Sequence, residues 1–213
     1  KIYGRDLTAR LAREGSDAYH YTRSLYTDGQ IDAEFQPVGR IQLANTLGHF
    51  QAMKEKAGIL NGLHDQGIQV VERDQLSQHI QSDIYFGGLY YPDHGGIHPR
   101  KAHDGLLKKA LSAGVIVHPH TPVLSVKIRA NGYEIQTNKG RMIANKLIIA
   151  TNGYTTPVIR WLSRRIFRIP SYLIATEELP ADIVSRVAPG RHMMVESRAR
   201  HSYFRPSPDG KRI

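Results

Sequence analysis

The strongest constraint on the fold is a pair of tight turns in the second half of the chain. Asn131-Gly132 follows an alternating apolar and polar run over 123–129, and the return run over 133–137 leads into a second turn at 138–140. An Asn-Gly pair between alternating runs is the strongest short-range signal for a two-residue β-hairpin. The sequence therefore predicts a three-stranded antiparallel meander over 123–144.

Helical and strand-like patterns surround this meander. Apolar residues recur at helical spacing over 7–25, 47–63 and 99–113, and a short helix is predicted over 74–81. Further strands are predicted over 35–43, 68–71, 115–117, 146–151 and 172–176, and 193–213 is predicted to hold two strands joined by a turn at Ser207-Pro208-Asp209-Gly210. This pattern predicts an α/β (mixed α+β) fold of one or two domains.

The composition excludes several chemistries. The 213 residues include no Cys, which rules out disulfides, thiolate metal ligands and a thiol nucleophile. A chain without Cys fits a reducing compartment, and we predict a cytoplasmic protein. No apolar run approaches the ~20 residues that span a bilayer, so no membrane span is predicted.

The net charge of +10 is unevenly distributed. Residues 1–138 carry 15 basic and 14 acidic side chains, whereas residues 139–213 carry 14 basic and 5 acidic ones. Such a skew indicates nucleic acid, an anionic ligand, an acidic partner surface, or acidic sequence of the same domain outside this chain. Because no nucleic-acid-binding motif accompanies the basic residues, we predict no nucleic-acid partner.

The familiar catalytic motifs are missing. The sequence has no dinucleotide or P-loop glycine motif, no nucleophile elbow and no paired-histidine zinc motif. His94 and His98, and His118 and His120, have spacings that suit a metal, but no acidic cluster accompanies them, so no metal site is predicted. The aromatic residues beside the glycines of 87–96 suit an amine pocket, with edge-strand packing as the alternative.

Several short motifs follow one another in a specific order. They are Gly87-Gly88-Leu89, Gly96-Ile97-His98-Pro99, Thr121-Pro122-Val123, Ile148-Ile149-Ala150-Thr151-Asn152-Gly153-Tyr154, Ile174-Ala175-Thr176-Glu177, Tyr203-Phe204-Arg205 and Asp209-Gly210-Lys211-Arg212. In this order they resemble the FAD-dependent amine and amino-acid oxidoreductases of the D-amino-acid oxidase family, nearest to its gamma-glutamylputrescine oxidase branch. The resemblance covers nearly the whole chain.

The resemblance implies a division into domains and a set of site residues. A partial FAD-binding doubly wound domain with an inserted β-meander is expected over 99–154, and an antiparallel-sheet substrate domain over 1–98 and 155–213. FAD is expected to contact Val123, Ala150, Thr151, Asn152 and Gly153, and the substrate Tyr90, His98, Tyr203 and Arg205. Arg205 and Tyr203 could hold a substrate carboxylate by charge-assisted hydrogen bonds, with surface packing as the alternative.

The implied activity is oxidation of the C–N bond of a primary or secondary amine by hydride transfer to FAD. Another flavin enzyme of the glycine, sarcosine or proline type is the alternative, and a basic nucleic-acid-binding module is the more remote one. The start at Lys1 and the end at Ile213 suggest an internal fragment that lacks the family's dinucleotide fingerprint. We therefore expect this chain alone to be inactive, to retain little FAD and to be prone to self-association.

Overall fold

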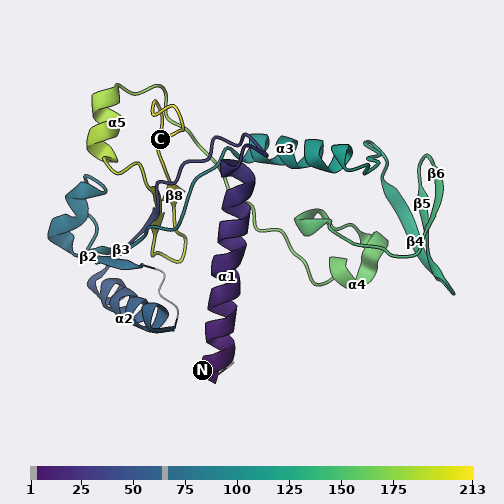
Figure 1. Cartoon of the computed structure of the whole chain (residues 1–213), viewed down its shortest axis with the longest axis horizontal. Coiled ribbons are helices and arrows are strands. Elements are labelled where there is room, and N and C mark those ends of the chain that lie inside the picture. Colours follow the sequence, from purple (N-terminus) through teal and green to yellow (C-terminus); the bar gives the residue numbers. More distant parts are fainter. Residues whose placement is uncertain (1–3, 64–66) are drawn as a thin grey trace. The chain divides into compact units, whose positions relative to one another are not determined.

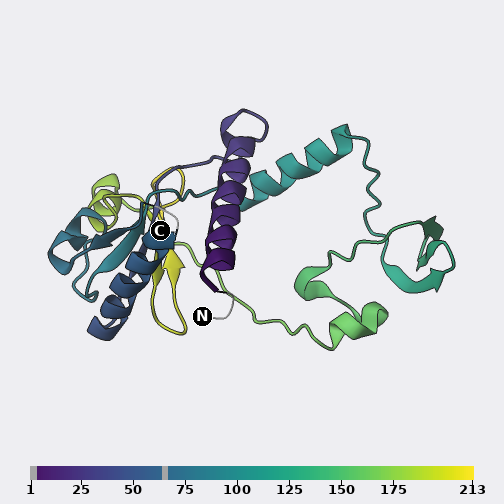
Figure 2. The same ribbon diagram turned by 60° about the horizontal axis from the view of Figure 1, so that its bottom comes forward.

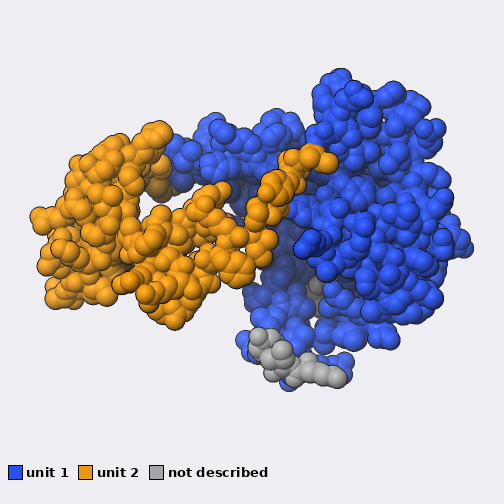
Figure 3. All heavy atoms as spheres, turned by 180° about the vertical axis from the view of Figure 1, so that it is seen from behind, with its two compact units in different colours: residues 1–112, 175–213 blue, residues 113–174 orange. Residues whose placement is uncertain are grey.

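The computed structural model describes residues 4–63 and 67–213. The chain divides into two compact units: unit 1 contains residues 1–112 and 175–213, and unit 2 contains residues 113–174 (Figure 3). Both units contain helices and strands, so the predicted mixed α/β class is confirmed.

Unit 1 contains most of the helices (Figure 1). They are α1 (Gly4–Thr27), α2 (Leu47–Leu63), the 3₁₀ helix η1 (Arg73–Gln78), α3 (Pro99–Ser112) and α5 (Ala181–Val187). The helices predicted over 7–25, 47–63 and 99–113 are thereby confirmed. The short helix predicted over 74–81 is a 3₁₀ helix that begins at Arg73 and ends at Gln78.

A five-stranded sheet forms the centre of unit 1. Its strands lie in the order β2 (Gln69–Val71), β3 (Gly88–Tyr91), β1 (Arg40–Leu43), β7 (Met193–Glu196) and β8 (Tyr203–Phe204). Strand β1 pairs antiparallel with β3 and parallel with β7, and β8 pairs antiparallel with β7. Strand β1, at the centre of the sheet, therefore links β3 from the first half of the chain with β7 near the C-terminus.

The first face of this sheet, which we call the η1 face, is the more apolar. Ile41, Leu43 and Met194 are almost fully buried there, and they pack with Leu76 of η1. The residues that follow α5 complete the same cluster through Ala188. This cluster is the largest in unit 1 because two short helices cover the strands from one side.

The opposite face, which we call the α2 face, is covered only in part. Leu89 and Tyr91 of β3 pack against Phe50 and Met53 of α2. Figures 1 and 2 show α2 and α5 on opposite sides of the sheet. At the other edge of this face the Tyr203 side chain is 61% exposed, so the face opens from β3 towards β8.

Unit 2 contains the predicted meander. Strands β4 (Val123–Arg129), β5 (Gly132–Thr137) and β6 (Gly140–Ala144) pair antiparallel in chain order, which confirms the prediction. The turn needs Gly132 because its φ is +129° and a Cβ there would collide with the carbonyl oxygen of Ala144. Helix α4 (Arg160–Ser163) and the 3₁₀ turns η2 (Asn152–Tyr154) and η3 (Pro157–Ile159) complete the unit.

Three predicted strands are absent from the ladders of the described residues. The segments 115–117, 146–151 and 172–176 pair with no strand, and the side chains of Ile148 and Leu173 are 88% and 93% exposed. Their apolar composition predicted strands. A β-strand, however, forms only where a neighbouring strand shares its backbone hydrogen bonds, and no described strand pairs with these segments. These three strand predictions are therefore wrong for this structure.

The C-terminal segment also differs from expectation. Strands β7 and β8 both precede the turn at 207–210, whereas the sequence predicted strands on either side of it. The turn itself is present, since the Gly210 N–H donates to the Ser207 carbonyl at 2.9 Å. The strand predicted over 35–43 is shortened to β1, with an isolated bridge between Gln36 and Gly96. None of the described helices combines the length and apolar character needed to cross a bilayer.

The packing of β1 predicts a large effect of one core truncation. Ile41 is 0% exposed, so Ile41→Ala is expected to lower the free energy of unfolding by about 2–5 kcal/mol through lost burial and a residual cavity. Ile59→Ala on α2, where the side chain is 64% exposed, is the matched control and should change it by less than ~0.5 kcal/mol. Urea unfolding followed by circular dichroism measures both, and equal effects would contradict the assigned core.

Candidate functional site

The predicted substrate residues of the last strand lie on the α2 face. Phe204 packs into the cluster on the η1 face, so its neighbours Tyr203 and Arg205 project to the other side. The register places Val195 opposite Tyr203 and Met194 opposite Phe204. Tyr203 and Arg205 therefore stand beside the open part of the sheet.

Arg205 contacts the loop before α3, which carries His98. The Arg205 Nη2 group donates to the carbonyl of Ile97 at 2.7 Å. A Cβ at Gly96 would meet Nη1 of the same guanidinium, so a larger residue there would displace the end of the Arg205 side chain. The His98 Nδ1 accepts a hydrogen bond from the Lys101 N–H at 3.4 Å, so this ring caps the start of α3.

Tyr90, the fourth predicted substrate residue, lies on the opposite face from Tyr203. Its ring packs against the η1-face cluster and lies 5.4 Å from the ring of His79 and 4.8 Å from that of His192. Burial, and then the neighbouring His192, lower the pKa of His79. The structure therefore brings Arg205 to the loop that carries His98 but separates Tyr90 from Tyr203 by the thickness of the sheet.

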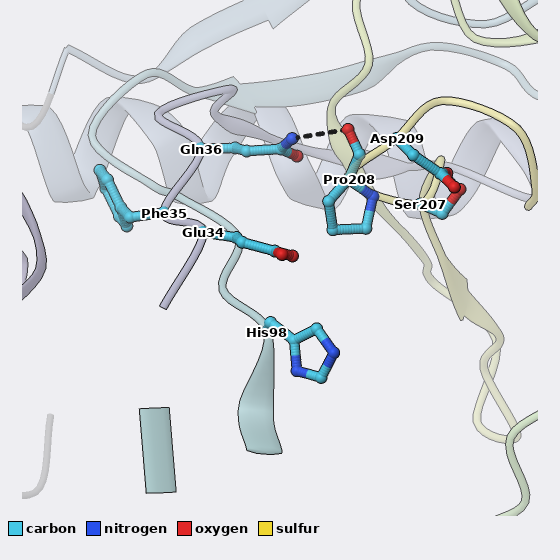
Figure 4. A pocket seen from close by; sticks show the side chains of 7 residues that line it. All are labelled: Glu34, Phe35, Gln36, His98, Ser207, Pro208 and Asp209. Atoms are coloured by element: carbon cyan, nitrogen blue, oxygen red, sulfur yellow. Dashed lines mark hydrogen bonds between the residues drawn. The ribbon is translucent and has the colours of Figure 1, made fainter. Parts of the chain in front are cut away.

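A cavity of about 620 Å³ lies beside His98 in unit 1 (Figure 4). It is lined by Glu34, Phe35, Gln36, His98, Ser207, Pro208 and Asp209. Its carboxylates already have partners in the chain, since Glu34 pairs with Lys101 at 2.5 Å and Asp209 accepts from the Ser207 hydroxyl at 2.5 Å. Within the described residues, no three His, Cys, Asp or Glu side chains gather as a metal site.

A buried carboxylate at the end of β7 holds the adjoining loop. Glu196 is 4% exposed and accepts hydrogen bonds from the Tyr85 hydroxyl at 2.9 Å and the Asn45 amide at 3.3 Å. It also accepts from Arg198 Nη2 at 2.5 Å and from the Ser202 N–H at 3.3 Å. Because Ser202 directly precedes Tyr203, this network fixes the start of β8.

The same network shifts two ionisation equilibria. Burial opposes the charge of Glu196, but the hydrogen bonds from Arg198, Tyr85, Ser202 and Asn45 prevail and lower its pKa to about 2. Burial and the neighbouring Glu196 carboxylate raise the pKa of Tyr85 far above its usual value. Both groups therefore keep one protonation state throughout the neutral range.

The predicted FAD-contacting residues lie in unit 2. Val123 begins β4, and Ala150 and Thr151 end an apolar segment that has no ladder partner. Asn152 has a φ of +48° and its side chain accepts from the Gly153 N–H at 2.8 Å, which makes a tight turn. The carbonyl of Gly153 in turn accepts from Arg168 Nε at 2.5 Å.

This arrangement fits a segment that approaches a cofactor. The side chains at 150–153 are short, and Ala150, Thr151 and Asn152 are exposed. None of the backbone groups of 146–150 has a backbone hydrogen-bond partner among the described residues. Polar backbone groups on an exposed, small-residue segment are available to the polar groups of a dinucleotide.

Comparison with known proteins identifies the family. A sequence model of the family described as "FAD dependent oxidoreductase" matches residues 2–213. Two proteins named "Probable oxidoreductase OrdL" are similar to this chain: that of Haemophilus influenzae is 29% identical over 150 residues (68% of this chain and 35% of the relative). That of Rhizobium meliloti is 26% identical over 218 residues, which are 99% of this chain and 49% of the relative. The chain belongs to the family of FAD-dependent oxidoreductases.

A solved structure shows the same fold. Glycine oxidase from Geobacillus kaustophilus superposes with a TM-score of 0.69 at 17% sequence identity, over 98% of this chain and 52% of that one. The chain thus spans about half the length, or less, of the relatives that it matches. The family resemblance and the FAD cofactor predicted from the sequence are confirmed at the level of the family.

Sequence reasoning missed two charged residues of unit 1. Glu196 carried no signal because its partners Tyr85 and Asn45 are more than a hundred residues away. Arg40 stands on the central strand over the ring of Tyr91, and only the alternation of β1 hinted at which face it occupies. Both depend on the parallel pairing of β1 with β7, which no local pattern indicates.

The Glu196 network predicts a defined dependence of stability on pH. Its folded-state pKa of about 2 lies below the usual 4.5, so the ionised carboxylate stabilises the fold above about pH 4.5. This contribution is lost as the pH falls from 4.5 to 2. The stability difference between the wild type and Glu196→Gln, on the order of 2–3 kcal/mol at neutral pH, should shrink over that range.

Denaturant unfolding at several pH values measures this difference. Glu178→Gln is the matched control, because that carboxylate is exposed and pairs only with Lys211 and Arg212 among the described residues. At neutral pH it should change stability by less than ~1 kcal/mol. A Glu196→Gln difference that stays constant from pH 6 to about pH 2 would contradict the assignment.

Proposed function

We propose that the protein oxidises the C–N bond of a primary or secondary amine with FAD, in the manner of a gamma-glutamylputrescine oxidase. The observation that carries this proposal is the match of the FAD-dependent oxidoreductase family over residues 2–213. The order of motifs from Gly87 to Arg212 supports the gamma-glutamylputrescine branch. A cytoplasmic location is part of the proposal.

Each unit supplies a different part of the reaction. Bound FAD supplies the acceptor for a hydride from the carbon that bears the amine. In unit 2, the short side chains of 150–153 let the backbone approach the cofactor, and Arg168 holds the turn at Gly153. In unit 1, Tyr203 and Arg205 face the open side of the sheet and orient the substrate.

The second candidate is an amino-acid oxidase or dehydrogenase of the glycine, sarcosine or proline type. Its support is the fold similarity to glycine oxidase at a TM-score of 0.69. The two candidates differ in substrate length, because gamma-glutamylputrescine is several times longer than glycine. A long substrate needs contacts spread over more than one strand of the sheet.

Anaerobic flavin reduction tests the activity. The complete product of the gene that encodes this chain, loaded with FAD, is mixed with gamma-glutamylputrescine, glycine, sarcosine or proline without oxygen. Bleaching of the oxidised flavin band by gamma-glutamylputrescine at the highest kcat/KM supports the first candidate. Faster bleaching by one of the amino acids favours the second, and no bleaching by any amine contradicts both.

Ala150 offers a test of the cofactor segment. Its side chain is exposed in this structure, so Ala150→Leu can be accommodated by the chain itself. If FAD packs against this segment, the larger side chain should weaken FAD binding at least ~10-fold, a cost of about 1.4 kcal/mol. Ala113→Leu, also exposed in unit 2, is the control and should bind FAD as the wild type does. Fluorescence titration of the gene product's apoprotein with FAD measures both, and equal affinities would exclude a cofactor contact at Ala150.

A further inference from the structure

Three rings of unit 1 gather on the η1 face, on the side of the sheet opposite Tyr203. They belong to His79, which directly follows η1, to Tyr90 on β3 and to His192, which directly precedes β7. The ring centroids of His79 and His192 are 5.0 Å apart, and they lie 5.4 and 4.8 Å from that of Tyr90. This three-ring cluster joins η1 to β3 and to the start of β7.

His79 lies between two residues that attach η1 to the sheet. Leu76 and Ile80, which are 2% and 4% exposed, both belong to the buried cluster of the η1 face. The His79 N–H donates to the Leu76 carbonyl at 2.9 Å, and the Gln81 N–H donates to the Val187 carbonyl at 3.0 Å. A change in the charge of His79 therefore acts at the point where η1 is attached.

The His79 ring is placed where a positive charge is unfavourable. Its Nδ1 is buried and has no hydrogen-bond partner among the described residues. A protonated imidazole carries an N–H on both nitrogens, so the buried Nδ1–H of a charged His79 would be left without an acceptor. An unpaired buried donor costs free energy, and a charged one costs more. The fold therefore favours the neutral ring.

His192 adds a like charge when it is protonated. Its Nδ1–H donates to the Val38 carbonyl, which holds the ring beside His79. Because a carbonyl can only accept, Nδ1 already carries the proton of the neutral ring, and a second proton would go to Nε2. Two charged imidazole rings with centroids 5.0 Å apart repel each other. Burial, and then His192, accordingly hold the pKa of His79 below its usual value.

No carboxylate among the described residues offsets this repulsion. Neither His79 nor His192 takes part in any ion pair of the described part of the chain. The Glu196 carboxylate on the same face is bound within its own network. Other charged side chains of the surrounding elements have different partners or are exposed: Glu72 pairs with Lys54, Arg73 bonds the Asp83 carbonyl, Arg191 bonds the carbonyls of Ser207 and Pro208, Arg40 lies over Tyr91 on the other face, and Asp74, Asp182 and Arg186 are exposed.

We propose that the three-ring cluster is an acid-sensitive latch, in which protonation of His79 beside His192 shifts η1 towards release from the sheet. The latch is closed above about pH 6.5, the usual pKa of histidine, and weakens as the pH falls below that value, because the fold favours the neutral ring. This window lies above the one expected for Glu196. Release of η1 would uncover β1 and β7 by local opening, with the α2 face still covered by α2.

Hydrogen–deuterium exchange with mass spectrometry tests the latch in the complete product of the gene that encodes this chain. Peptides over 74–81 report on η1, and peptides over 50–60 of α2 are the internal control. After correction for the intrinsic exchange rate, protection over 74–81 should fall at least ~10-fold from about pH 7.5 to about pH 5.5. Protection over 50–60 should change by less than ~3-fold. A fall that is absent, or equal in both sets of peptides, overturns the proposal.

Variants identify the titrating ring. In His79→Gln, protection over 74–81 should vary by less than ~3-fold across the same pH range. His103→Gln is the matched control and should show the wild-type fall, because that ring is exposed on α3 beside Asp104. His192→Gln keeps an N–H donor for the Val38 carbonyl and removes the like charge, so the fall should be smaller than in the wild type.

Each outcome for these variants decides the proposal. A wild-type fall in His79→Gln overturns it, and so does loss of the fall in His103→Gln. If a thermal melt at about pH 7.5 shows that His79→Gln is unfolded, His192→Gln decides instead, and a fall equal to that of the wild type overturns the proposal. The measurement needs no amine substrate, so its result is independent of the proposed oxidation.

Discussion

The parallel pairing of β1 with β7 is the interaction on which the rest of unit 1 depends. It aligns Arg40 with Met193 and Leu43 with Glu196, and so joins segments from opposite ends of the chain. Through this pairing the β7–β8 hairpin is placed beside the helices of the first hundred residues. Without it, the buried Glu196 network would not form, because it draws residues from both sides of the pairing.

Local patterns predicted the long helices and the meander, whereas they could not predict which distant segments pair in the sheet of unit 1. The meander was predictable because the Asn131-Gly132 turn fixes the register of its neighbours, and α3 because Pro99 marks a helix start. The apolar run 146–151 predicts a strand by its composition, yet it pairs with no described strand. Composition gives a segment its preference for a strand, but only a partner segment provides the hydrogen bonds.

The candidate site was predictable to a similar degree. The motif order pointed to Tyr203, Arg205 and His98, and the structure does bring Arg205 to the loop that carries His98. Tyr90 was placed with them because it follows the same glycine-rich stretch. Its neighbour Tyr91, and not Tyr90, faces the side on which Tyr203 stands. Side chains alternate along a strand, so an error of one residue exchanges the two faces of the sheet.

This alternation also explains how the two faces of one short sheet differ, one packing in the core and the other carrying polar side chains. On the η1 face, Ile41, Leu43 and Met194 are buried and their identity is set by packing. On the α2 face, α2 packs on β2 and β3, and the strands beyond carry Arg40, Gln42 and Tyr203 beside the apolar Met193 and Val195. A sheet that exposed both faces would lack a core. Partial cover by α2 thus leaves polar side chains exposed on a rigid support, as a small-molecule binding site requires.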